Sequence, residues 1–422
     1  MTMQPIWPVG TMEWSKKSSK KTKFARFIPC AGHSLNLVGR SAVDCCLDAV
    51  NCSGVINEIY ISFSSSTKRW AVLKSHLEPQ SKVPKYLSET RWEAHAKATE
   101  AILESYSAII GALNDLYSDV NMKGDTRLKA NNLLQKMEEL EFVFMLHFWN
   151  CVLDHFHKVN EAIQKSDLLL STCANLYTSL QDIVQEIRED FDELEQQAKT
   201  TLPNVDYRTV RRIKIKRNRQ GNDGSASGPD ALDELSSRDK FRVKSFIPIL
   251  DALETNLRRR GAVYNNIAKM FSFLANLSLS KQEIQQGVEL LMEAYPEDVD
   301  LKLTDELLHF HIYVKKNHKP EEKSHLSHTD LYQIIYKENI QMAFPNVEAI
   351  LRLFLTLMVT NCSGERSFSS LKRIKNELRS SMSQERLSAL SILCIESDKL
   401  RQIDIDELLD DFAAIKYRKI LL

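Results

Sequence analysis

The pair Cys30 and His33 offers a thiol and an imidazole three residues apart, after a stretch that predicts a short strand closed by a proline. Both side chains are zinc ligands, but two ligands supply only half of a tetrahedral site. Cys45, Cys46 and Cys52 are available to complete it, although the spacing matches no standard zinc finger. We therefore favour a structural role at the start of a helix and expect no metal.

Glu365 is the second candidate for chemistry, in the stretch Cys-Ser-Gly-Glu-Arg-Ser-Phe-Ser that covers residues 362–369. By itself it is compatible with a surface carboxylate paired with Arg366 or Lys372, an arrangement that contributes little stability. Trp92, preceded by Arg91, starts a long helical block and by itself is compatible with a core tryptophan that anchors the first helix of the block.

Helices must position these residues, because only 12 glycines and 11 prolines in 422 residues leave few tight turns. Apolar residues recur at helical spacing in several segments, and 280–283 (Ser-Lys-Gln-Glu) and 381–384 (Ser-Met-Ser-Gln) have the composition of helix caps. Pro345 suits the first turn of a helix. The principal expected helices cover 55–76, 102–117, 136–153, 176–194, 281–294 and 347–359.

Composition bounds the class of protein. Lys and Arg number 56, as do Asp and Glu, so the formal net charge is zero and any argument for nucleic acid must rest on local clusters. Eight cysteines without a CxxC pair favour reduced thiols, in the cytosol or nucleus. No stretch approaches the roughly 20 apolar residues of a membrane span, so we expect no membrane partner.

Two basic segments stand out locally. Residues 1–23 contain five lysines among Pro, Gly and Trp, which favours a solvated, disordered leader over a localisation signal or phosphate contact. Residues 208–219 carry seven basic side chains and precede a Gly/Ser/Asp-rich stretch. We expect a flexible basic linker over about 208–239, with phosphate contact as the alternative.

The motifs together, in this order and spacing, resemble the hAT transposase superfamily. The resemblance runs from about residue 24 to the C-terminus and includes the phrases Ser-Leu-Asn-Leu-Val-Gly, Phe-Pro-Asn-Val-Glu and Leu-Lys-Arg-Ile-Lys-Asn. It is nearest to the branch found in zinc finger MYM-type protein 1-like and TTF-type zinc finger sequences. It implies a mainly α chain: a partial RNase H-like α/β domain, lacking its N-terminal strands, interrupted by a large all-α insertion.

The resemblance also implies a catalytic chemistry, in which two aspartates and a glutamate hold two Mg²⁺ ions for phosphodiester cleavage. The family's glutamate corresponds to Glu365, with Gly364 where the family has alanine. The two aspartates belong upstream of Cys30, where this sequence contains only Glu13 as an acid. Glu365 is therefore expected to be a vestigial acid, with no cofactor unless a complete acid triad existed.

Further roles follow from the resemblance alone. It implies that Trp92, Arg91 and Arg366 contact DNA. The aromatic face of a tryptophan can stabilise an unpaired base that stacks on it by roughly 1–3 kcal/mol. It also implies that the C-terminal region pairs between subunits through Leu387, Leu390 and Leu393, and through Leu408, Leu409 and Phe412. The alternative is that these faces pack only within the chain.

We thus expect a non-catalytic, transposase-derived nuclear or cytoplasmic protein that forms a homodimer, with possible residual DNA binding. The alternative is an N-terminally incomplete form of an active hAT transposase, which cleaves and joins DNA with metal ions. The expected domains are a basic leader (1–23), an RNase H-like remnant (24–86), a helical insertion (87–328), and C-terminal RNase H-like helices with the dimerisation region (329–422).

Overall fold

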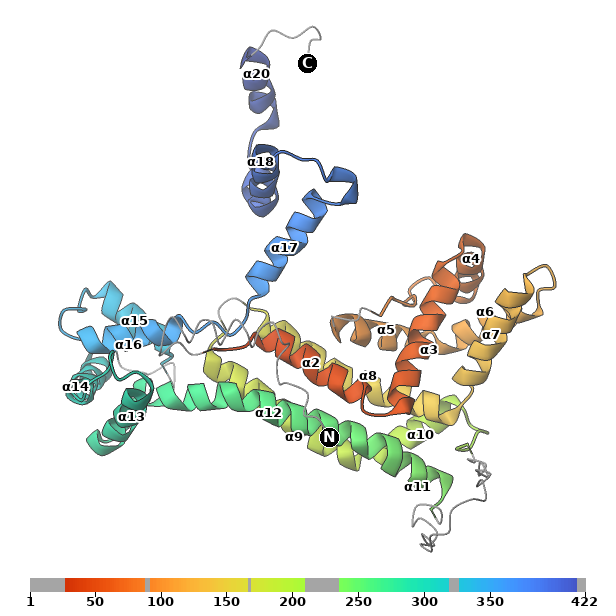
Figure 1. Ribbon diagram of the computed structural model, residues 1–422, viewed down its shortest axis with the longest axis horizontal. Coiled ribbons are helices and arrows are strands. Elements are labelled where there is room, and N and C mark those ends of the chain that lie inside the picture. The colour runs from red at the N-terminus through yellow and green to blue at the C-terminus, as the bar shows by residue number, and fades with distance from the viewer. Residues whose placement is uncertain (1–26, 88–91, 166–167, 209–234, 319–325, 416–422) are drawn as a thin grey trace, which may run out of the picture. The chain divides into compact units, whose positions relative to one another are not determined.

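The computed structural model describes residues 27–87, 92–165, 168–208, 235–318 and 326–415, and these residues are mainly helical (Figure 1). The chain divides into two compact units, unit 1 (Met1–Val359) and unit 2 (Thr360–Leu422), each considered by itself below. Among the described residues, no helix is both long enough and apolar enough to cross a membrane.

The described helices of unit 1 are α2 (Ala31–Val43), α3 (Leu47–Ser64), α4 (Thr67–His76), α5 (Trp92–Glu104), α6 (Tyr106–Ser118), α7 (Gly124–Met137), α8 (Leu140–Ile163), α9 (Leu170–Glu189), α10 (Phe191–Thr201), α11 (Ser237–Phe241), the π-helix η2 (Arg242–Phe246), α12 (Ile247–Phe271), the 3-10 helix η3 (Ser272–Leu274), α13 (Lys281–Ala294), α14 (Lys302–Asn317), α15 (His328–Lys337) and α16 (Pro345–Leu355). Those of unit 2 are α17 (Cys362–Ile374), the 3-10 helix η4 (Glu377–Arg379), α18 (Gln384–Ile395), α19 (Ser397–Leu400) and α20 (Ile405–Ile415).

The long helices α9 and α12 lie side by side and form the axis of unit 1 (Figure 1). Gly261 allows their close approach, because a Cβ atom there would lie 3.3 Å from the Cβ atom of Tyr177. The rings of Tyr177 and Tyr264 meet with centroids 5.1 Å apart. Helix α2 packs along α12 at this point, so three segments far apart in the sequence share one core.

Aromatic rings fill the core where α8, α10 and η2 converge. The ring of Phe246 lies 5.8 Å from Phe144, 5.4 Å from Phe148 and 5.1 Å from Phe191, and all four side chains are fully buried. Such tilted and edge-on pairs add about 0.5–1.5 kcal/mol each to the effect of burial. This cluster connects α10, which precedes the segment 209–234, to η2 at the start of α12, which follows that segment.

Two buried histidines attach the part of unit 1 from α13 to α16 to the end of α12 and to η3. His311 is 2% exposed and its Nε2 lies 3.0 Å from the carbonyl oxygen of Leu274. His328 is 6% exposed and its Nε2 lies 2.9 Å from the carbonyl oxygen of Phe271. Both rings therefore satisfy the last carbonyl groups at the end of α12 and η3, where the helical ladder leaves acceptors without partners.

Burial lowers the pKa of both His311 and His328, because desolvation disfavours the charged ring. The folded state then binds fewer protons than the unfolded state below about pH 6.5, so the free energy of unfolding falls as pH decreases through that range. We expect urea denaturation at pH 5.5 to give a lower unfolding free energy than at pH 7.5.

The double variant H311Q/H328Q is expected to lose part of this pH dependence, since glutamine can still donate to the two carbonyls but does not titrate. H33Q, at the exposed His33, is the matched control. An unchanged pH dependence in H311Q/H328Q would refute the assignment.

The expected capping box at Ser280 and Glu283 is confirmed, as is Pro345 in the first turn of α16. Other helix limits were wrong. The helix expected over 55–76 divides into α3 and α4, because Ser66 adopts an extended conformation. The helix expected over 136–153 divides after Met137, and the one over 176–194 divides at Asp190.

The described residues contain no strand. The strand expected before Cys30 falls partly outside them, and its described part, from Phe27, has an irregular backbone. The carbonyl of Pro29 accepts a hydrogen bond from the Tyr264 hydroxyl at 3.0 Å, and proline has no N–H to donate to a sheet. The partial RNase H-like domain and the domain limits remain predictions.

Candidate dimerisation and nucleic-acid sites

Cys30 and His33 lie at the beginning of α2, as expected for a helix-opening motif. Cys30 occupies the N-cap position without a capping hydrogen bond, and His33 is exposed. The backbone N–H of Ala31 donates to the carbonyl of Val359 at 2.9 Å. The start of α2 therefore lies beside the end of unit 1, directly before the segment that carries Glu365.

Two buried tyrosines hold this helix start in place. The Tyr177 hydroxyl donates to the carbonyl of Ala31 at 2.8 Å. The Tyr264 hydroxyl lies 3.0 Å from both the Pro29 carbonyl and the Ser34 hydroxyl. Burial raises the pKa of Tyr264, so its hydroxyl stays protonated and able to donate. The motif is thus built into the core at its backbone.

We expect Y264F to lower the free energy of unfolding by about 1–3 kcal/mol, because the Pro29 carbonyl and the Ser34 hydroxyl lose a buried partner. Chemical denaturation of parent and variant measures the difference. Y336F, at a tyrosine that is 67% exposed, is the matched control and should change stability little. Equal effects of the two substitutions would refute the role of the buried hydroxyl.

No metal centre emerges around the cysteines. Within the described ranges, no group of three or more His, Cys, Asp or Glu side chains is arranged to hold a metal ion. Cys45 is exposed, Cys46 is half-buried and Cys52 is buried. Burial raises the pKa of the Cys52 thiol to about 12.

Glu365 and Arg366 lie in the first turn and a half of α17. The sequence placed their motif between helices, whereas the structure begins α17 at Cys362, directly after the N-cap residue Asn361. The side chains of 362–366 lie outside the description, so their catalytic and DNA-contacting roles stay predictions.

Trp92 is the first residue of α5, while Arg91 lies outside the described residues, as does the side chain of Trp92. Next to them the structure has a cavity of about 250 Å³ lined by Lys85, Tyr86, Glu93, Ala94 and Lys97.

Sequence reasoning missed this neighbourhood. Tyr86 is 52% exposed, and its ring centroid lies 5.8 Å from that of Tyr60. Lysines beside an exposed ring are typical of surfaces that contact nucleic acid. Glu93, however, pairs with Lys97 and neutralises part of that charge.

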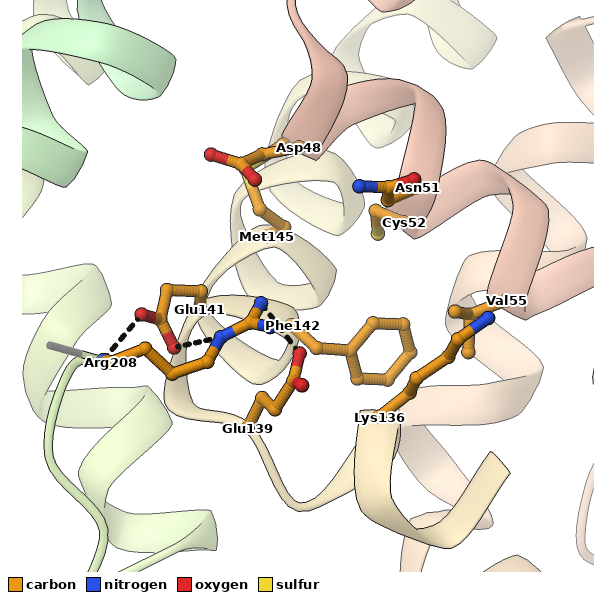
Figure 2. Close-up of a pocket in the computed structure, with 10 residues that line it drawn as sticks. All are labelled: Asp48, Asn51, Cys52, Val55, Lys136, Glu139, Glu141, Phe142, Met145 and Arg208. Carbon is orange, nitrogen blue, oxygen red and sulfur yellow. Dashed lines mark hydrogen bonds and ion pairs between the residues drawn. The ribbon is translucent and has the colours of Figure 1, made fainter. Parts of the chain in front are cut away.

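A second pocket, of about 190 Å³, is acidic and lies between α3 and the start of α8 (Figure 2). The guanidinium of Arg208 enters it and pairs with Glu139 at 2.7 Å and with Glu141 at 3.8 Å. The backbone N–H of Arg208 also donates to Glu141 at 2.7 Å. Asp48 of α3, which also lines this pocket, accepts a hydrogen bond from the Ser245 hydroxyl.

This pocket therefore anchors the first residue of the basic segment 208–219. Desolvation raises the pKa of Glu139, although the positive charge of Arg208 acts in the opposite direction. The rest of that segment, from 209, and the leader 1–23 lie outside the described residues. Sequence reasoning gave Arg208 to a solvated linker, and no short-range pattern connects it to acids 67 residues earlier.

The C-terminal leucines lie on α18, which has no buried residue. Leu387 and Leu390 are half-buried and Leu393 is 44% exposed. Ile392 and Ile395, on the same helix, are 61% and 63% exposed. In contrast with the helices of unit 1, this helix leaves its apolar side chains without a core inside unit 2.

Helix α20 has the same property. Ile405 is 66% exposed, Leu408 55%, Leu409 43% and Phe412 47%. A carbon-rich surface of this extent on two successive helices is typical of an interaction site, because water contact with it is unfavourable.

Comparison with known proteins agrees with this location. Residues 312–398 match the hAT family C-terminal dimerisation region, so this region runs from α14 to α19 and contains Leu387, Leu390 and Leu393. It also contains Glu365, whereas Trp92 and Cys30 lie outside it.

Two curated relatives carry the name "52 kDa repressor of the inhibitor of the protein kinase". The Homo sapiens protein is 21% identical over 343 residues, covering 79% of this chain and 43% of the relative. The Mus musculus protein is 21% identical over 344 residues, covering 79% and 44%. The chain therefore spans less than half the length of these relatives. No solved structure matches it significantly.

Proposed function

We propose that this is a transposase-derived protein that acts by forming a homodimer through unit 2, without cleaving DNA itself. The observation that carries the proposal is the set of exposed apolar side chains on α18 inside a matched dimerisation region. Complete burial of one leucine side chain contributes about 1.5–3 kcal/mol. Leu387 and Leu390 are already half-buried and would contribute less than this each, while Ile392, Leu393 and Ile395 still expose a large part of their side chains to a partner.

The non-catalytic part of the proposal rests on the two relatives, whose shared name describes a repressor. That name favours a regulatory role over strand transfer. The alternative of an active transposase needs a two-metal site with several carboxylates, of which Glu365 would be one.

DNA binding belongs to the same proposal, with Trp92, Arg91 and Arg366 as contacts and the basic segment 208–219 as a phosphate-binding element. Nuclear localisation follows if the protein acts on DNA. The assignment to the zinc finger MYM-type protein 1-like branch also stays a proposal, since the two relatives carry a different name.

Dimerisation is tested by replacing the three leucines of α18 together. We expect the parent to be a dimer at micromolar concentration in light scattering coupled to gel filtration, and L387S/L390S/L393S to be a monomer. L290S, at a leucine that is 58% exposed on α13, is the matched control and should remain dimeric. A monomeric parent would contradict the proposal.

Catalysis is tested with supercoiled plasmid and Mg²⁺ or Mn²⁺. We expect neither the parent nor E365Q to nick the plasmid above background, because a single carboxylate holds no metal pair. Metal-dependent nicking by the parent that E365Q abolishes would favour the active-transposase alternative. Heat-denatured protein provides the background rate.

A further inference from the structure

Helix α20 lies beyond the matched region, which ends at residue 398, and has two opposite faces. One face carries the exposed apolar side chains Ile405, Leu408 and Leu409. All charged residues of α20 are acidic, and at 100° per residue they occupy the other face. Asp406 and Asp411 flank the apolar face on its two sides.

The segment 367–379, formed by α17 and η4, has the complementary character. It contains four basic residues and one acidic residue. Phe368 is 72% exposed and Leu378 is 96% exposed. Lys372 stands one helical turn after Phe368, and Arg379 follows Leu378, so a positive charge accompanies each exposed apolar side chain.

These charges are available for a partner. Lys372, Arg379, Asp406 and Asp411 are exposed and form no ion pair within the described part of the chain. Between the two surfaces, Lys399 of α19 and the following Arg401 are already paired with nearby acids. On α18, Glu385 and Arg386 have no ion pair among the described residues, but their charges are opposite and leave no net charge. The excess of positive charge in unit 2 therefore lies on α17 with η4, and the excess of negative charge on α20.

We propose that α20 of one copy packs on α17 and η4 of a second copy, and that the second copy returns the same contact. The inference rests on the proposed homodimer and adds to it a contact made by α20, which lies beyond the matched region. A two-fold axis produces both contacts from one geometry, because each surface is complementary to the other and not to itself. Apolar side chains would supply affinity, and the flanking charges would set the pairing.

Charge reversal distinguishes this exchange from contact within one chain. In K372E/R379E the reversed side chains are acidic and face the acidic flanks of α20. In D406K/D411K the two side chains that flank the apolar face of α20 become basic and face basic α17 and η4. Each alone should raise the dimer dissociation constant by about tenfold or more, since both contacts in the homodimer become repulsive. Sedimentation equilibrium at low salt measures the constants.

An equimolar mixture of the two variants is the decisive measurement. In the mixed dimer, acidic α17 of one variant meets basic α20 of the other, and the remaining pair is the parent's own. We expect the mixture to recover an affinity close to that of the parent. If α20 packed on α17 within its own chain, mixing would recover nothing, and that result would overturn the proposal.

The controls separate this inference from the proposed dimer. K123E/K129E changes the same charge on α7 of unit 1 and should leave the dissociation constant unchanged. A dimeric parent whose affinity is insensitive to both reversals would refute the exchange of α20 and leave the homodimer in place. A monomeric parent would refute both. Circular dichroism of each variant verifies its helical content.

Discussion

The close packing of α9 against α12 is the interaction on which unit 1 depends. Gly261 faces this contact, where an added Cβ atom would lie 3.3 Å from the Cβ atom of Tyr177, a tight approach that would require the tyrosine to shift by a few tenths of an ångström. The two tyrosines in turn hold the backbone before and within the first turn of α2 through Pro29 and Ala31. Because Ala31 also bonds to Val359, one helix pair connects the first described residues with the last of unit 1.

Helix content was predictable from the sequence because apolar spacing and caps are local properties. The capping box at Ser280 and the proline of α16 depend on residues within one turn. Interruptions were less predictable. The break before α4 results from Ser66 in an extended conformation, and a serine is compatible with either state until tertiary contacts decide.

A candidate site could be predicted from the sequence when the residues that form it are close together in the chain. The leucines of α18 were placed on one helix face from periodicity, and their pairing role came from the resemblance; the matched dimerisation region contains all three. The Arg208 anchor was missed, because Glu139 and Glu141 reach it only after α8 to α10 have folded. The core role of the Cys30 motif lies in its backbone, which side-chain types do not reveal.

The exposed apolar side chains of α18 and α20 have a consequence for how the protein would behave in a cell. If a second copy covers α18 and α20, the fraction of chains that are dimeric rises with protein concentration, and so with the rate of synthesis, by mass action. Newly synthesised monomers would expose apolar helix faces to chaperones and proteases, whereas dimers would not. A molecule would then be degraded faster at low protein concentration than at high concentration. The steady amount of dimer would therefore rise steeply above a threshold rate of synthesis.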